Sequence, residues 1–209
     1  MASAKTDQRR EAGQRTRTRL LDAALDLLAE RGPDGVTLRA LTDAADANVA
    51  AVSYHFGSLQ SLCDAAVERA LERYLDAQEE AVGALGPEST LEQVAAAFAR
   101  PMMNAIAVGG GDLAVMRIVA RVGIDPPQGW ERFDARFDRI RRDVLRLVKP
   151  HLPDAKDKEL IFRTRCMAGI LNWLVLAPVG AELRNRSEKQ IERQVVPVLA
   201  GTLRGHGSG

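Results

Sequence analysis

The fold is decided by residues 36–62, which read VTLRALTDAADANVAAVSYHFGSLQSL. Two short helices are expected here, 38–45 and 49 to about 55, because Thr37 and Asn48 are residue types that cap helix N-termini. Gly57 and Ser58 end the second of them and begin another. Two short helices separated by only a few residues have the spacing of a helix-turn-helix. The segment therefore predicts a compact helix-turn-helix.

The two expected helices divide their side chains between a buried and an exposed side. Apolar side chains predicted to point inward are Leu38, Leu41, Val52 and Phe56, and small residues predicted at the helix crossing are Ala44, Ala45 and Ala47. The side chains left outside on the second helix are Val49, Ala50, Ser53 and Tyr54. A slim helix face of this kind can enter the major groove of duplex DNA. Helical hairpins of this size are common, so spacing alone does not establish DNA binding.

The residue string is more specific than its spacing. Residues 12–62 resemble the TetR family of bacterial one-component regulators, and the segment NVAAVSYHFGS at 48–58 is similar to that family's recognition-helix motif. The resemblance implies an all-α chain with an N-terminal three-helix helix-turn-helix head on a larger helical ligand-binding and dimerisation body. It implies a sequence-specific repressor that a small ligand releases from a palindromic operator. Beyond residue 62 the resemblance rests on length and helical layout.

The resemblance also assigns roles to positions in the head. Thr37 caps its helix and hydrogen-bonds a phosphate, and Asn48 caps the next helix close to the DNA backbone. Ala50, Ser53 and Tyr54 face the groove, and His55 contacts phosphate. The competing interpretation is packing within the head, which is less favoured for Tyr54 than for His55. Phe56 is expected to be structural.

Two positions depart from the family pattern. The turn carries Asp46 where glycine is usual, and the fourth helix begins with Leu59 where a phosphate-binding lysine is usual. Asp tolerates a left-handed backbone better than most residues, so the turn survives at some conformational cost. Its negative charge is unhelpful near DNA, and affinity is expected to depend more on Arg15, Arg17 and Arg19. These departures keep open an alternative: a helical protein-interaction module that has lost DNA binding.

Charge and composition set the remaining bounds. The 209 residues carry a formal net charge of +1, so the placement of positive charge matters more than its total. The opening stretch holds six cations, Lys5, Arg9, Arg10, Arg15, Arg17 and Arg19, against only Asp7 and Glu11. Such a basic arm alone suggests a frayed terminus, and it gains meaning from the helix-turn-helix that follows. We expect residues 1–58 to form the DNA-binding domain and residues 59–209 the ligand-binding and dimerisation domain.

Several classes of protein are disfavoured. The two cysteines, Cys63 and Cys166, lie far apart, so neither a disulfide framework nor a zinc site is expected. No secretory signal and no membrane span is evident, which points to the cytoplasm. His55, His151 and His206 belong to no catalytic constellation. We therefore expect no enzyme, no metal and no cofactor.

The body is expected to consist of helices at about 59–82, from Thr90 through Pro101 with a kink or break there, and at 112–123, 128–149, 154–179 and 188–203. Glycines 109–111 are expected to form a loop. The last two helices are the expected homodimer interface through Ile161, Met167, Ile170, Leu171, Leu174, Val175, Ile191, Val195, Val198 and Leu199; an ordinary monomer core is the alternative. Unbranched and aromatic side chains suit a pocket for a lipophilic ligand, though they fill plain cores equally well. The candidates are Phe98, Met102, Met103, Ile106, Met116, Phe133, Phe137, Asn172 and Trp173.

Overall fold

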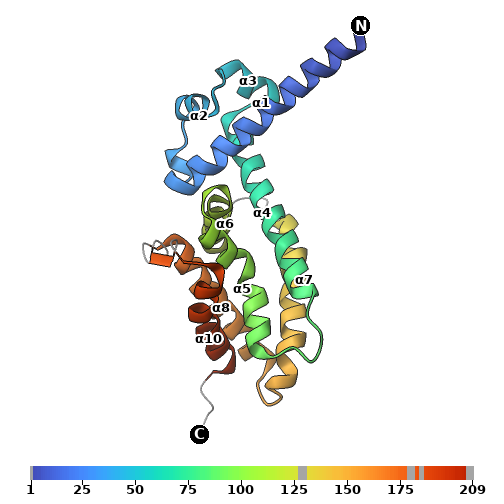
Figure 1. Cartoon of the computed structure of the whole chain (residues 1–209), viewed down its shortest axis with the longest axis vertical. Helices are drawn as coiled ribbons and strands as arrows, with labels where there is room; N and C mark the ends of the chain where they lie inside the picture. The colour runs from blue at the N-terminus through green and yellow to red at the C-terminus, as the bar shows by residue number, and fades with distance from the viewer. Residues whose placement is uncertain (1, 127–130, 178–181, 184–185, 206–209) are drawn as a thin grey trace. The chain divides into compact units, whose positions relative to one another are not determined.

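The computed structural model describes residues 2–126, 131–177, 182–183 and 186–205, and within these ranges the regular structure is entirely helical (Figure 1). The chain divides into two compact units, residues 1–71 and 72–209, here called the head and the body. The division lies inside the helix α4 (Leu59–Gly83). The expected all-α fold is thereby confirmed.

The head consists of α1 (Ala2–Arg31), the 3-10 turn η1 (Pro33–Gly35), α2 (Leu38–Ala45), α3 (Val49–Phe56) and the first part of α4. The predicted bounds of α2 and α3 are confirmed to within one residue. The basic stretch is part of α1, which begins at Ala2, so the competing interpretation as a frayed terminus does not hold in this structure. Ala, Arg, Gln and Glu are good helix formers, and the single Gly13 does not interrupt them.

The core of the head lies where α2 and α3 pack against α1. Leu20 of α1 and Leu41 of α2 have no exposed surface, and Val52 of α3 has almost none. An ion pair on the surface joins α1 to α4, because Arg69 Nη2 donates to Asp22 Oδ1 over 2.5 Å. Apolar contact thus holds α1, α2 and α3 together, and an ion pair adds α4.

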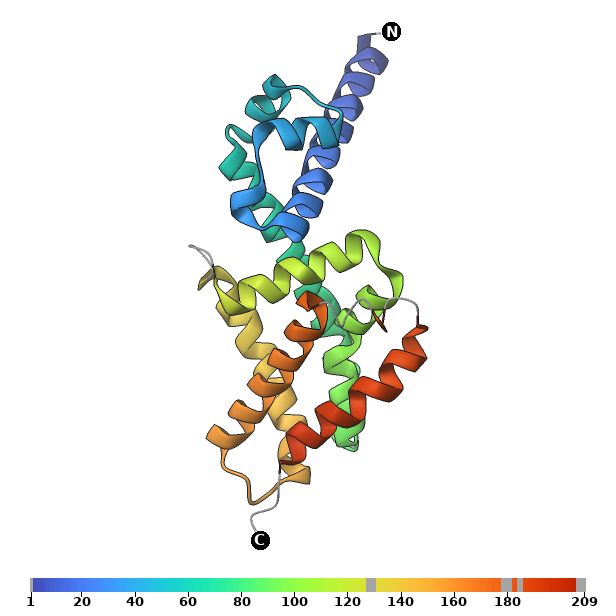
Figure 2. The same ribbon diagram turned by 90° about the vertical axis from the view of Figure 1, so that its left-hand side faces the viewer.

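The body contains the rest of α4, then α5 (Leu91–Val108), α6 (Gly110–Ile124), α7 (Glu131–Val148), η2 (Lys149–His151), α8 (Asp157–Leu176) and α10 (Glu188–Arg204). The helix α10 packs against α5 and α8, and α6 packs against the same two helices (Figure 2). Capping boxes begin α5 at Thr90–Gln93 and α10 at Ser187–Gln190.

The helix α5 differs from its prediction at Pro101 and at its C-terminal end. It runs through Pro101 as one helix, so of the expected kink or break the break is absent. The buried Gln78 of α4 donates from Nε2 to the carbonyl oxygen of Phe98 over 3.1 Å, at the turn that precedes the proline. Gly109 alone separates α5 from α6, so the expected glycine loop shortens to one residue.

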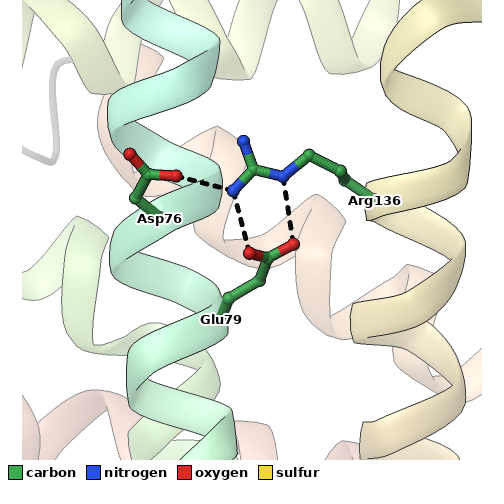
Figure 3. A network of polar contacts seen from close by, with 3 residues as sticks. All are labelled: Asp76, Glu79 and Arg136. Carbon is green, nitrogen blue, oxygen red and sulfur yellow. Dashed lines mark hydrogen bonds and ion pairs between the residues drawn. The ribbon is translucent and has the colours of Figure 1, made fainter.

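A polar network joins α4 to α7 within the body (Figure 3). Arg136 on α7 donates from Nε and Nη2 to the two carboxylate oxygens of Glu79, over 3.0 and 2.9 Å. Its Nη2 also donates to Asp76 Oδ1 over 2.7 Å. These hydrogen bonds from Arg136 hold the pKa of Glu79 below its usual value, and they raise the pKa of Arg136. Such two-pronged arginine–carboxylate pairs are stronger than ordinary surface ion pairs.

Replacing Glu79 by Gln removes the charge from this network and is expected to lower the free energy of unfolding by about 1 kcal/mol. For a chain of this length that corresponds to roughly 2–4 °C in melting temperature. Because the pKa of Glu79 is lowered in the folded state, its contribution is complete above the ordinary pKa of 4.5 and is lost as the pH falls through the folded pKa. Thermal unfolding at pH 7 and at acid pH checks this.

The matched control is Asp143→Asn, which removes a carboxylate paired with Arg146 on an exposed part of α7. Its effect is expected to be less than about 0.5 kcal/mol. Equal melting temperatures for the two variants at neutral pH would show that the α4–α7 network contributes nothing special.

Candidate nucleic-acid interface

The ends of α3 are set by local hydrogen bonds. Asn48 Oδ1 accepts from the backbone nitrogen of Ala51 over 2.8 Å, and Gly57 ends the helix with a φ of 80°. Thr37 caps α2 in the same way, since its Oγ1 accepts from the nitrogen of Ala40 over 3.2 Å. Both predicted N-caps are confirmed. The cap engages Oδ1 of Asn48, which leaves its Nδ2 as the atom able to donate outward.

The two sides of α3 differ sharply in exposure. Val52 is buried, whereas Val49, Ala50, Ser53 and Tyr54 are exposed, as predicted. Tyr54 is the extreme case, with 85 % of its surface exposed. An apolar ring left in solvent on a helix whose other side is buried has no role in the core.

The inward set predicted for the head needs two corrections. Leu41 and Val52 are buried, but Leu38 and Phe56 are only half-buried. Ala45 is buried at the helix crossing, whereas Ala44 is exposed and takes no part in it. Ala44 lies on the solvent side of α2 because α2 is amphipathic with a buried face at Leu41, Thr42 and Ala45.

His55 is half-buried beside α1. Its ring meets Tyr54 edge-on with centroids 4.9 Å apart, and a Cβ at Gly13 would lie 3.8 Å from its Cε1. The ring therefore contacts both the exposed tyrosine and the first helix. Of the two aromatic positions, Tyr54 is free to reach a ligand, and His55 also packs within the head.

An open groove lies between α1 and α3. Five of the residues predicted to contact DNA line it: Arg19, Asn48, Ala50, Tyr54 and His55. Thr16, Asp46, Ala47 and Ala51 complete its lining. Ser53 and Thr37 are exposed outside this lining. A groove with a helix N-terminus and an arginine in its lining suits an anionic partner.

The three predicted arm residues have different surroundings on α1. Arg15 is exposed and lies 3.8 Å from Glu11. Arg17 is half-buried, with its guanidinium 5.0 Å from the centre of the Phe56 ring. Arg19 lies at the groove and pairs with Asp46. Arg15 is thus placed to meet solvent anions, while Arg17 also stabilises the end of α3 by a cation–π contact.

Asp46 adopts the left-handed conformation expected of the turn, with φ 46° and ψ 54°. Sequence reasoning missed its partner, since Arg19 is 27 residues away and Nη1 of Arg19 lies 3.3 Å from Asp46 Oδ2. It also missed Arg39, an exposed cation on α2 that lies 3.9 Å from Asp43. Arg39 could have been predicted from the sequence, because a basic residue on the outer face of the first helix of a helix-turn-helix is typical of phosphate contacts.

The predicted ligand-contact residues fall into three classes of exposure in the body. Met102, Met103, Ile106, Met116 and Phe133 are buried, and Phe98, Phe137 and Asn172 are half-buried. Trp173 is 58 % exposed, so it lies on the surface of the single chain. Two buried polar residues of α4 were missed: Tyr74, whose burial raises its pKa to about 12, and Gln78, whose Oε1 has no hydrogen-bond partner. The helical spacing of Leu71, Leu75 and Gln78 on α4 could have indicated the buried glutamine.

The last two helices present an apolar face to solvent, but of the predicted interface residues only Val198 is more than half exposed on it. Met167, Leu171, Val175, Ile191, Val195 and Leu199 are buried in the chain's own core, which excludes them from a surface in this structure. Ile161, Ile170 and Leu174 are half-buried. Phe162 and Trp173 on α8 and Val198 on α10 are more than half exposed. The helices are apolar on two sides, and most of the predicted residues lie on the inner side.

Two other kinds of site have no counterpart in the described ranges. Among the residues of these ranges, no group of His, Cys, Asp or Glu side chains is arranged to hold a metal ion. Within the same part of the chain, no helix is long and apolar enough to cross a membrane.

Comparison with known families gives two matches along the chain. Residues 20–66 match the family model described as bacterial regulatory proteins, tetR family. Residues 96–201 match a model described as the C-terminal domain of a tetracyclin-repressor-like protein. Among curated protein sequences, none matches the chain significantly.

Solved structures similar to the chain include a TetR family transcriptional regulator, PfmR, from Thermus thermophilus, with a TM-score of 0.64 and 20 % identity over 91 % of this chain and 97 % of that one. A TetR-like transcriptional regulator from a Rhodococcus species gives 0.63 and 16 %, with the same coverage. A putative TetR-family regulator from Mesorhizobium loti gives 0.57 and 17 %, over 92 % and 96 %. At these identities the likeness concerns the fold.

Proposed function

The chain belongs to the TetR family of bacterial regulatory proteins and is a transcriptional regulator with a helix-turn-helix DNA-binding domain, and from this premise we propose that the exposed face of α3 reads a palindromic operator. In this proposal Ala50, Ser53 and Tyr54 face the bases. The helix-cap residues Thr37 and Asn48, together with His55 and the arginines 15, 17 and 19, meet the phosphates. The observation that carries the proposal is the exposure of Tyr54 on the outer side of α3, in the groove that also contains the helix cap Asn48.

The physical case rests on what α3 offers to DNA. Its outer face combines small side chains with one large ring, so the backbone can approach the floor of a major groove closely. Its N-terminus, capped by Asn48, carries the positive end of the helix dipole, which favours phosphate. The arginines of α1 supply charge that compensates for the leucine at position 59.

A second copy of this chain is the proposed partner of α8 and α10. Phe162, Trp173 and Val198 expose apolar surface on these two helices. Gly169 on α8 and Gly201 on α10 are surrounded by open space, which allows another helix to approach closely. A dimer of this kind brings two reading helices to one duplex, where half-sites one turn apart require a spacing of roughly 34–36 Å.

The body is proposed to bind a small lipophilic effector. The buried methionines 102, 103 and 116, with Ile106 and Phe133, supply an adaptable apolar interior. A ligand lowers operator affinity when it binds more tightly to the dimer whose heads have a spacing that does not fit the operator. The size of the decrease is set by the difference between the ligand's affinities for the two spacings. A ligand that stabilises the body without changing operator affinity would argue against this mechanism.

The alternative is a helical protein-interaction module that has lost DNA binding. The salt dependence of binding to duplex DNA distinguishes it from the proposal. Phosphate contacts release counterions, so the DNA affinity of a regulator falls steeply as the salt concentration rises. A protein-interaction module has no such dependence on duplex DNA.

Replacing Tyr54 by Ala is expected to weaken binding to the operator about tenfold, because one base-facing contact of ordinary strength is lost. The operator is first selected from random duplexes with the purified protein, and affinity is then measured by fluorescence anisotropy. Binding to unrelated duplex is expected to change little, since Tyr54 is not assigned to phosphate.

The control is Val108→Ala, which truncates another largely exposed side chain, in the body. It is expected to leave operator affinity unchanged. Tyr54→Ala protein that binds the operator as tightly as the parent would remove Tyr54 from the contact set.

Replacing Trp173 by Asp is expected to convert a dimer into monomers, because it places a charge in the proposed apolar interface. Sedimentation equilibrium reports the oligomeric state, and circular dichroism confirms that the helices remain. Val108→Asp introduces the same charge at an exposed site outside α8 and α10 and should leave the dimer intact. Dimers in both variants would place the interface elsewhere.

A further inference from the structure

We propose that Asp46 attenuates DNA binding by holding Arg19 in an ion pair that the DNA phosphate must displace. The inference rests on the proposed DNA-binding function and assigns a regulatory role to one residue of the same groove. It makes the strength of operator binding depend on a competition between a carboxylate and a phosphate for one guanidinium.

The geometry puts the competitor at the place where DNA would bind. Arg19 Nη1 lies 3.3 Å from Asp46 Oδ2, and both residues line the groove that also contains Asn48 and Tyr54. The Asp46 side chain is 99 % exposed and that of Arg19 is 49 % exposed. An anion that approaches the capped N-terminus of α3 therefore meets Arg19 with its charge already matched.

The carboxylate of Asp46 has no evident part in the fold. The helix α2 is closed by the backbone of this residue, whose N–H bonds to the carbonyl oxygens of Asp43 and Thr42. The side chain contributes the pair with Arg19, and pairs as exposed as this one stabilise a fold very little. Its effect is therefore expected on binding and not on folding.

The backbone conformation at residue 46 does not explain why an acidic residue is present there. It is the only residue other than glycine with a positive φ in the described part of the chain. Glycine adopts this conformation without steric cost, and Asn adopts it about as readily as Asp. The turn thus requires no carboxylate, and Asn provides a substitution that keeps the backbone while removing the charge.

Two electrostatic effects act in the same direction. The carboxylate occupies Arg19, and it also repels any phosphate that approaches the N-terminus of α3. Removing it frees one cation for a phosphate contact. Each added phosphate contact steepens the dependence of log affinity on log salt by about 0.9.

The experiment compares Asp46→Asn with the parent in binding to operator and to unrelated duplex across a series of salt concentrations. The expected result is a rise in affinity of roughly three- to tenfold at low salt for both duplexes, with a salt slope steeper by about one contact. Unchanged thermal stability verifies that the fold is intact.

Asp43→Asn is the matched control, because it removes an exposed carboxylate three residues away whose pair with Arg39 is longer, at 3.9 Å, and which lies outside the groove lining. Its gain in affinity is expected to be clearly smaller. Arg19→Ala and the double variant Arg19→Ala/Asp46→Asn complete a cycle, in which the gain from Asp46→Asn should be clearly smaller once Arg19 is absent, because only the repulsion between Asp46 and phosphate is then relieved.

Four outcomes would overturn the inference. Equal gains from Asp46→Asn and Asp43→Asn would indicate a general charge effect, as would an undiminished gain in the absence of Arg19. Weaker binding by Asp46→Asn would show that the pair positions Arg19 for DNA. If the parent and every variant bind no DNA, the proposed function itself fails; specific binding by the parent with no advantage for Asp46→Asn refutes this inference alone.

Discussion

The packing of one valine and one leucine against α1 is the constraint on which the reading surface depends. A helix of eight residues such as α3 is not stable by itself in water. It forms because Val52 is buried on the side of α3 that packs against α1 and α2, and because Asn48 and Gly57 satisfy its two ends. The same burial leaves the opposite side of the helix, with Tyr54, in solvent. The packing that stabilises α3 in the head therefore also fixes which of its sides is exposed.

The first helix supplies the cations of the groove, and some of these cations are already paired within the head. Because α1 is helical from Ala2, its arginines are held at regular positions on a helix instead of on a loose tail. Arg17 is engaged with Phe56 and Arg19 with Asp46, while Arg15 has only a long pair with Glu11. The affinity of the head for an anion is therefore a balance between cations on α1 and acids of the same unit. The counting of positive residues in the sequence overstates the charge that is free.

Local features of the fold were predictable from the sequence, and features that depend on distant partners were not. Caps, turns and the bounds of α2 and α3 are decided within a few residues, so Thr37, Asn48 and Gly57 sufficed to predict them. The Arg19–Asp46 pair joins residues 27 apart, which no periodicity reveals. On α8, periodicity identified an apolar helix but could not tell its inner side, at Met167, from its outer side, at Trp173. The identities of base-contacting and ligand-contacting residues remain predictions for the same reason: they depend on molecules outside the chain.

The most direct test of the account is the accessibility of guanine N7, an atom of the major groove, to methylation in operator DNA bound by the protein. The account predicts two clusters of protected guanines on one side of the duplex, with centres about one helical turn apart. Loss of protection at the central guanines of each cluster in Tyr54→Ala protein would place α3 in the groove. Full reactivity of every guanine N7 in a tightly bound operator, or protection in a single cluster, would contradict the insertion of two copies of α3 into the major groove.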